Sequence, residues 1–279
     1  MKGSTEPQTR DHPLVFADRF DRLADFGVFL MHKRDYEEAA ALTRGSCVLD
    51  LGCNNGYGAD ILARGCSKVV AADVSEAALA DAEARFDDRG IVFQVIDGRS
   101  LPFSDATFET VVSFQVIEHV DDVDTYLGEI RRVLKPDGRA LLTTPNKRIR
   151  LDPGMTPWNR FHVQEFTHEE LRWLLACYFK SVRVRGLFAS ERMYRMERKR
   201  YERSRALARN GIDARLKRLA KSILPDTLQS QIRRIVRGEA RDRSYSEVKS
   251  KEYSTKEYFY RETDLDEALT LFAVCRKGS

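Results

Sequence analysis

The sequence lacks the features that mark membrane-spanning, secreted or metal-binding proteins. No stretch approaches the ~20 consecutive apolar residues that a membrane-spanning helix needs. Residues 1–10 are polar and contain no apolar core of a secretory signal. The five cysteines are scattered, without a CxxC pair or another metal-ligand spacing, at Cys47, Cys53, Cys66, Cys177 and Cys275. We therefore expect reduced thiols, no metal centre and a cytoplasmic location.

Charge is present in both signs but is unevenly distributed. With 42% hydrophobic and 32% charged residues, the composition is that of an ordinary globular protein rather than a disordered chain. The net charge of +4 conceals an excess of basic over acidic residues of more than two to one between Arg183 and Arg243. This asymmetry indicates two different functional surfaces.

From residue 45 onward, short apolar runs alternate with helix-like segments. The pattern predicts helices over 76–86 and 126–134, and apolar spacing predicts a further helix within the first 45 residues. The predicted strands cover 47–51, 69–73, 91–97, 110–114, 139–144, 181–184 and 269–274. Residues 135–138 form a predicted turn before the fifth strand. Such alternation predicts an α/β fold, with a mostly parallel seven-stranded sheet and helices on both faces.

The interval between the last two predicted strands is too long for a loop in a compact domain. Apolar residues recur there at helical spacing between Ile212 and Ile235, with Pro225 as a break. We therefore divide the chain into an N-terminal helical cap (1–44), a core (45–188), a basic helical insertion (189–264) and the last core strand (265–279).

A glycine-rich turn follows the first predicted strand and leads into a helix. Gly52 and Gly56 allow positive φ and close approach of a ligand to the backbone, and the helix start offers unpaired N–H groups. Asp50 ends the strand and would repel a pyrophosphate, but it suits a ligand that carries an amino group and a positive charge.

Two further acids follow the next two strands. Asp73 lies at the spacing expected for a residue that binds a ribose. Asp97, which precedes Gly98, is placed to accept a hydrogen bond from an adenine amino group. Any one of these acids is more often a cap or turn residue, but three in order around a glycine turn indicate one nucleoside-binding crevice.

Residues 45–188 resemble the class I S-adenosylmethionine-dependent methyltransferases, which have a Rossmann-like sheet. The residues that carry the resemblance are Val48–Cys53, Asp73, Leu101–Phe103, Phe108, Val116–Val120, Leu134–Gly138 and Thr144–Asn146. The resemblance implies S-adenosylmethionine as cofactor and assigns residues to it. Asp50, Gly52, Cys53, Asn54 and Gly56 would surround the methionine part, Asp73 the ribose, Asp97, Gly98 and Leu101 the adenine, and Gln115 the methionine end. Val74 is a further expected cofactor-binding residue.

Asn54 departs from the family pattern, which usually has glycine at this position. Asparagine tolerates left-handed geometry better than most residues, so we expect the turn to be preserved.

His119 and His162 are the candidate bases for an acceptor hydroxyl. His119 follows the fourth predicted strand, and a structural hydrogen bond is an equally good interpretation of it. His162 lies in a loop after the fifth strand, where catalysis, acceptor binding and a structural role remain open. Thr167 and Glu170 form a predicted capping box. His32 and Tyr36 either cover the cofactor or are ordinary residues of a surface helix.

The basic insertion has three interpretations: a solvated helical cap, a surface held against anionic lipid, or a binding site for a phosphate-rich acceptor. Nucleic acid is the least favoured partner, because aromatic residues there are few. No Asn-Pro-Pro-Tyr or Asp-Pro-Pro-Tyr run follows the fourth strand, which argues against methylation of exocyclic base amines.

A looser resemblance, to bacterial methyltransferases of surface polysaccharide and glycolipid synthesis, makes a sugar hydroxyl on a glycan or glycolipid the preferred acceptor. The alternatives are O- or N-methylation of a small molecule, such as a quinone precursor or secondary metabolite, and a non-catalytic cofactor-binding scaffold. The expected location is cytoplasmic, with peripheral contact at the inner face of the membrane as a variant.

Overall fold

The computed structural model describes residues 23–209 and 252–278. In this part of the chain, a single mixed sheet has the strand order β3-β2-β1-β4-β5-β8-β6-β7. The strands are β1 (Cys47–Leu51), β2 (Lys68–Asp73), β3 (Ile91–Val95), β4 (Phe108–Phe114), β5 (Leu134–Pro145), β6 (Ser181–Ala189), β7 (Tyr258–Arg261) and β8 (Thr270–Arg276). Strands β1 to β5 pair in parallel, whereas β8 is antiparallel to both β5 and β6. The predicted Rossmann-like α/β fold is thereby confirmed.

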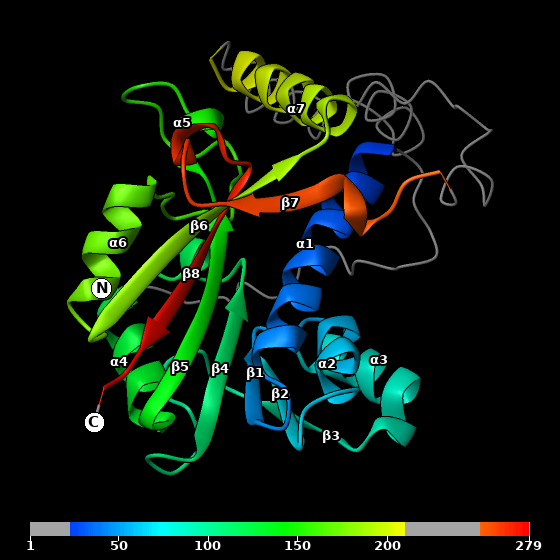
Figure 1. Cartoon of the computed structure of the whole chain (residues 1–279), viewed down its shortest axis with the longest axis vertical. Coiled ribbons are helices and arrows are strands. Elements are labelled where there is room, and N and C mark those ends of the chain that lie inside the picture. Colours follow the sequence, from blue (N-terminus) through cyan, green and yellow to red (C-terminus); the bar gives the residue numbers. More distant parts are fainter. Residues whose placement is uncertain (1–22, 210–251, 279) are drawn as a thin grey trace, which may run out of the picture.

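Helices cover both faces of the sheet (Figure 1). The helices are α1 (Leu23–Leu42), α2 (Tyr57–Ala63), α3 (Glu76–Phe86), α4 (Val123–Val133), α5 (Lys147–Arg150), α6 (His168–Ala176) and α7 (Glu191–Arg209). One buried cluster joins α1, α2 and α3 to one face of the sheet, and a second cluster joins α4 and α6 to the other. Alternate residues of β1 enter the two clusters, Val48 on one side and Leu49 on the other, as expected for a strand that is covered on both faces.

The helices begin where the sequence supplies capping side chains. Ser75 accepts a hydrogen bond from Ala78 N at the start of α3, and Asp122 accepts one from Thr125 N at the start of α4. At α6 the predicted capping box is confirmed, because Thr167 and Glu170 each accept from the backbone N–H of the other.

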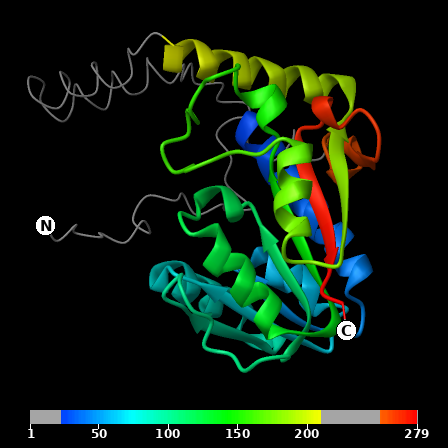
Figure 2. The ribbon, with the colours of Figure 1, turned by 90° about the vertical axis from the view of Figure 1, so that its left-hand side faces the viewer.

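A third buried cluster joins α1 to α7 and β7, beyond the two main layers. Helix α7 crosses one end of the molecule and lies beside α5 in both views (Figures 1 and 2). Met193 and Tyr201 are its buried apolar residues, and Tyr258 of β7 donates a hydrogen bond to the carbonyl oxygen of Gly27 in α1. The part of the insertion that the structure describes is therefore packed against the N-terminal helix.

The structure differs from the prediction at two strands. Tyr258–Arg261 forms an eighth strand, β7, inside the segment that we predicted to be helical, and it pairs antiparallel with β6. Residues 135–138 belong to β5, where the pairing with β4 shifts register and Asp137 has a φ of 59°, so the predicted turn is an irregularity within the strand. The predicted helical spacing between Ile212 and Ile235 falls outside the described residues.

Because β1, β2, β3, β4 and β5 run in parallel, their carboxyl ends meet at one edge of the sheet. The segments after these strands carry Gly52, Asp97, Gln115 and, further along, the loop that contains His162. This edge is where open α/β sheets bind their ligands. None of the helices within residues 23–209 and 252–278 combines the length and apolar character needed to cross a bilayer.

The face covered by α1 and α2 depends on Leu141, which is fully buried in β5. We expect Leu141→Ala to lower the free energy of unfolding by about 2–5 kcal/mol, because it leaves a cavity between sheet and helices. The control Trp173→Ala removes a side chain that is 74% exposed and should change stability by less than about 0.5 kcal/mol. Denaturant titration of both variants checks this, and equal losses would contradict the assignment of Leu141 to the core.

Candidate cofactor and acceptor site

The glycine-rich turn after β1 has the left-handed backbone that the sequence predicts. Gly52 and Gly56 have φ of 81° and 77°. A Cβ atom on Gly52 would lie 2.4 Å from a methyl carbon of Val116, so only glycine fits there. Asn54 has a φ of 48°, which confirms that asparagine replaces the usual glycine with its left-handed geometry preserved.

Asp73, at the end of β2, fastens this turn to the sheet. Its Oδ2 accepts a hydrogen bond from Asn54 N (2.8 Å), and its Oδ1 accepts one from Ser75 N (2.9 Å). Each oxygen has a second lone pair, so the carboxylate is able to accept further bonds from a ligand. The predicted ribose-binding residue therefore lies beside the turn predicted to hold the methionine part.

Asp50 is fully buried at the end of β1, and Tyr36 of α1 is its partner. The Tyr36 hydroxyl donates to Asp50 Oδ1 (3.0 Å), whereas Oδ2 has no hydrogen-bond partner among the described residues. Burial raises the pKa of Asp50 to about 7, and the charge of Asp73 adds to this effect while the Tyr36 bond opposes it. A buried carboxylate with an unsatisfied oxygen suits a ligand that brings a positive charge.

Tyr36 also packs against the start of α2. A Cβ atom on Gly58 would lie 2.1 Å from the Tyr36 ring, so the glycine makes room for the aromatic side chain. Of the two residues of α1 predicted as a cover for the cofactor, Tyr36 therefore contacts the predicted site. His32 lies near Arg200 of α7, and burial followed by the Arg200 charge lowers the pKa of His32 to about 4.

The predicted adenine residues form a more open part of the site. Asp97 is exposed and accepts hydrogen bonds from the backbone N–H groups of Arg99 and Ser100 (2.8 Å each), which lower its pKa. Val74 is 42% exposed, and a Cβ atom on Gly98 would lie 3.1 Å from its side chain. The apolar side chain of Val74 thus lies next to the turn that begins at Asp97, as required for a flat, partly apolar ring.

The remaining predicted cofactor residues are held in place by the backbone. Leu101 is buried, and its N–H donates to Glu129 (2.7 Å). Cys53 is buried, and its N–H donates to Ala72 O (3.1 Å). Gln115 has a φ of 57°, with its N–H bonded to Thr143 O (2.9 Å) and its side-chain amide bonded to Thr143 Oγ1 (3.1 Å).

The structure brings together the two candidate bases. The rings of His119 and His162 lie edge to face with their centroids 4.8 Å apart. His119 belongs to the 3₁₀ turn Ile117–His119, and its Nδ1 lies 2.9 Å from Phe161 O. His162 Nδ1 lies 2.7 Å from Glu165 Oε1.

Arg150 extends this arrangement behind His162. Its guanidinium donates to both oxygens of Glu165, at 2.9 and 3.0 Å, in a buried ion pair. Burial opposes ionisation of Glu165, but the bonds from His162 and Arg150 outweigh it, so the pKa of Glu165 is lowered. Arg150 in turn lies over the rings of Trp158 (4.2 Å) and Tyr201 of α7 (5.3 Å).

Sequence reasoning missed Glu118, Glu165 and Arg150. Glu118 is fully buried, its Oε2 accepts from Thr144 Oγ1 (3.1 Å), and burial raises its pKa to about 8. Their positions in the sequence could have indicated Glu118 and Glu165. Glu118 directly precedes one candidate base, and Glu165 follows the other by three residues. Arg150 gave no such signal, because its role depends on contacts with residues distant in the sequence.

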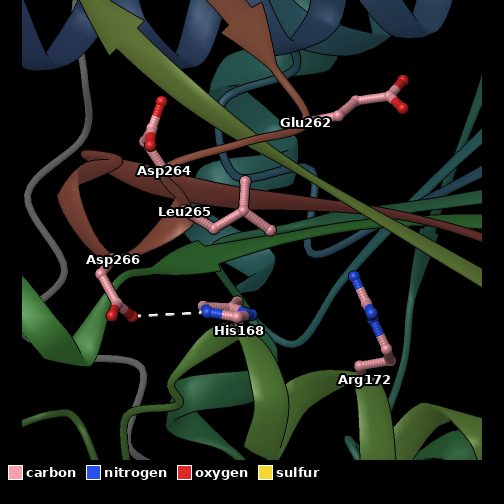
Figure 3. A pocket seen from close by; sticks show the side chains of 6 residues that line it. All are labelled: His168, Arg172, Glu262, Asp264, Leu265 and Asp266. Atoms are coloured by element: carbon pink, nitrogen blue, oxygen red, sulfur yellow. Dashed lines mark ion pairs between the residues drawn. The ribbon is translucent and has the colours of Figure 1, made fainter.

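A separate surface pocket of about 340 Å³ lies between α6 and the segment after β7 (Figure 3). His168 and Asp266 face each other across it as an ion pair, with Arg172 and Glu262 further along its wall. Its lining includes none of the predicted cofactor or acceptor residues. This pocket is therefore distinct from the predicted site.

Comparison with known proteins agrees with the geometry of the strand ends. Residues 49–142 match the family described as "Methyltransferase domain". This part of the chain is therefore similar to the methyltransferase domains of that family. The methyl donor of such a domain is S-adenosylmethionine, and the buried Asp50, the left-handed turn and Asp73 fit this ligand.

The relatives cover only part of the chain. A probable S-adenosylmethionine-dependent methyltransferase of Mycobacterium tuberculosis is 39% identical over 171 residues, which is 61% of each protein. The ubiquinone/menaquinone biosynthesis C-methyltransferase UbiE of Desulfotalea psychrophila is 41% identical over 120 residues, 42% of this chain and 49% of the relative. The chain thus spans less than two thirds of the length of these relatives.

A solved structure shows how widely the fold is shared. The crystal structure of the cyclase SpnF superposes with a TM-score of 0.54 at 20% identity, covering 89% of this chain and 82% of that one. At this identity the likeness concerns the fold alone.

Asp73 should be essential for cofactor binding, because it fixes the turn and offers acceptors to the ribose. We expect Asp73→Asn to raise the Kd for S-adenosylmethionine at least about tenfold, or about 1.4 kcal/mol. The control Asp88→Asn alters a carboxylate that is 72% exposed and should leave the Kd unchanged. Isothermal titration calorimetry checks both, and an unaltered Kd in Asp73→Asn would exclude the predicted role.

The raised pKa of Asp50 predicts pH-dependent cofactor affinity. A proton and the positively charged ligand compete for the carboxylate, so affinity falls as the pH falls through about 7. From pH 8 to pH 6 the Kd should rise about tenfold, because the Asp50 carboxylate becomes protonated. Asp50→Asn should lack this pH dependence of the Kd. Calorimetry of both proteins at several pH values therefore measures the part that is due to Asp50. Parallel pH profiles would show that Asp50 does not face the ligand's charge.

Proposed function

We propose that the protein is an S-adenosylmethionine-dependent methyltransferase that methylates an oxygen of its acceptor, a sugar hydroxyl on a glycan or glycolipid. The observation that carries the oxygen chemistry is the pair of histidines, His119 and His162. His119 N donates to the carbonyl oxygen of Val116, whose side chain packs against Gly52 of the predicted cofactor turn. A hydroxyl must lose its proton as it is methylated, and imidazole is suited to assist near neutral pH.

The tautomers of both histidines support this role. Because a backbone carbonyl only accepts hydrogen bonds, His119 Nδ1 donates to Phe161 O. The carboxylate of Glu165, held ionised by Arg150, likewise accepts from His162 Nδ1. In each neutral ring the lone pair then lies on Nε2. Both bases are thus oriented by a third group, as catalytic histidines usually are.

When bound, S-adenosylmethionine supplies a methyl group on a positively charged sulfur, which is a good leaving group. The contribution of this chain is to align donor and acceptor and to assist the loss of the hydroxyl proton. The sugar as acceptor rests on the looser resemblance of the N-terminal helix, the Thr144–Asn146 strand end and the His162 loop to methyltransferases of surface glycans.

A quinone precursor is the second candidate acceptor. The relative from Desulfotalea psychrophila carries a name from ubiquinone/menaquinone biosynthesis and favours this alternative. To separate the two, the purified chain is incubated with methyl-labelled S-adenosylmethionine and either glycan and glycolipid extracts or phenolic quinone precursors. O-methyl sugars after acid hydrolysis support the proposal, whereas label confined to the phenols supports the alternative.

Removal of His162 should slow the reaction without weakening cofactor binding. We expect His162→Asn to lower kcat by about 10²–10⁴, the usual contribution of a proton-accepting group. The matched control is His168→Asn, whose histidine lies in the separate surface pocket. Labelled methyl transfer gives kcat, and calorimetry gives the Kd for S-adenosylmethionine. Full kcat in His162→Asn would remove this residue from the reaction.

A further inference from the structure

Three groups that can bind a metal converge from two segments far apart in the sequence. Glu118, His119 and His162 each offer a ligand atom, and these atoms lie within 4.8 Å of one another. The N–H groups of Val163 and Gln164 donate to the carbonyl oxygen of Glu118, at 2.8 and 3.4 Å. The backbone therefore holds the His162 loop against the segment that carries the other two groups.

The hydrogen bonds at Nδ1 of the two histidines are of the kind that metal-binding histidines usually make. Ligating histidines usually donate the other ring N–H to a carbonyl or a carboxylate, which fixes the ring and the tautomer. His119 does so to Phe161 O (2.9 Å), and His162 does so to Glu165 (2.7 Å). In both rings the lone pair therefore lies on Nε2.

Glu118 provides an independent observation. Its side chain is fully buried, and Oε2 accepts from Thr144, but Oε1 has no hydrogen-bond partner among the described residues. An unsatisfied carboxylate oxygen in such a place is costly unless a cation or a donor meets it. Together with the two histidine ligand atoms within 4.8 Å, this oxygen favours a cation as the group that completes the cluster.

We propose that Glu118, His119 and His162 bind one divalent first-row transition-metal ion, such as Mn²⁺ or Zn²⁺. Two imidazole nitrogens with one carboxylate suit these ions better than Mg²⁺ or Ca²⁺, which prefer oxygen ligands throughout. Three protein ligands leave coordination positions open, as catalytic metal sites do.

The role of the ion rests on the proposed function. An acceptor hydroxyl in an open position has a lowered pKa and loses its proton to solvent. Its oxygen then forms the new bond to the methyl carbon while the carbon–sulfur bond breaks, and the electron pair remains on sulfur. The histidines would in this case activate the hydroxyl through the metal rather than accept its proton directly.

A second group with similar residues lacks these features. His168, Glu169 and Asp266 also lie within 4.8 Å of one another, but Glu169 and Asp266 are exposed. Asp266 additionally pairs with Arg148 at 3.2 Å, so a cationic side chain already occupies that position. This group supplies the control.

The test is titration of Mn²⁺ and of Zn²⁺ into the full chain after dialysis against a chelator, followed by calorimetry. We expect one equivalent of at least one ion to bind, with a Kd raised at least tenfold in Glu118→Gln and in His162→Gln. His168→Gln should bind like the unaltered protein. Glu165→Gln, which disturbs only the orienting partner, should raise the Kd about 10–100-fold.

The proposal is overturned if the unaltered protein binds neither ion, or if the Glu118 and His162 variants bind with the same affinity as the unaltered protein. It is also overturned if only His168→Gln loses metal binding. Circular dichroism shows which variants fold. If Glu118→Gln does not fold, the metal affinity of His162→Gln tests the site. Methyl transfer to glycan extracts is measured separately. Transfer without metal binding would overturn the metal site alone, whereas metal binding without transfer would overturn the proposed acceptor alone.

Discussion

The site depends on two buried carboxyl groups that lie at the carboxyl ends of central strands, Asp50 in β1 and Glu118 just after β4. Burying a carboxyl group without a full set of partners costs free energy, and this cost constrains the site. Asp50 and Glu118 are both fully buried. In each, one oxygen accepts a hydrogen bond from a hydroxyl, of Tyr36 or Thr144, and the other has no partner within residues 23–209 and 252–278. Burial raises their pKa values to about 7 and about 8. The folded chain thus retains protons that the unfolded chain loses at lower pH, and stability declines as the pH rises toward these values. A positive charge placed against either group offsets this cost.

The elements outside the central sheet are arranged around these groups. Helix α1 supplies Tyr36 to Asp50, and Asp35 on the same helix accepts a bond from Tyr260 of β7 (2.5 Å). Helix α7 places Tyr201 over Arg150, which orients Glu165 and through it His162. Several of the α7 arginines form ion pairs within the helix: Arg195 with Glu191, Arg198 with Glu202 and Arg200 with Glu197. Within the described part of the basic insertion, α7 is therefore a packed helix that lies behind the two candidate bases.

The sequence was informative where local chemistry decides the structure. Runs of β-branched and small apolar residues located the central strands, and the left-handed Asn54 followed from its tolerance of positive φ. Strand β7 was missed because Tyr258–Arg261 is short and lies in a segment whose helical spacing dominated the pattern. The approach of Glu118 to His162 was missed as well, and with it the possibility of a metal site. That approach depends on the β4–β5 pairing and on backbone bonds between two loops, which no spacing in the sequence records.

The boundary of the family match runs through the proposed site. The methyltransferase domain match covers residues 49–142, which include Asp50, Asp73, Glu118 and His119. Arg150, His162 and Glu165 lie beyond it, in the segment between β5 and α6 that includes α5. Since the cyclase SpnF shares the fold, the fold does not determine the reaction by itself. In the proposed site, the acceptor chemistry therefore depends on the place where Glu118 and His119, inside the match, meet His162, outside it. Helix α7 supports this place, because its Tyr201 packs on Arg150 of α5.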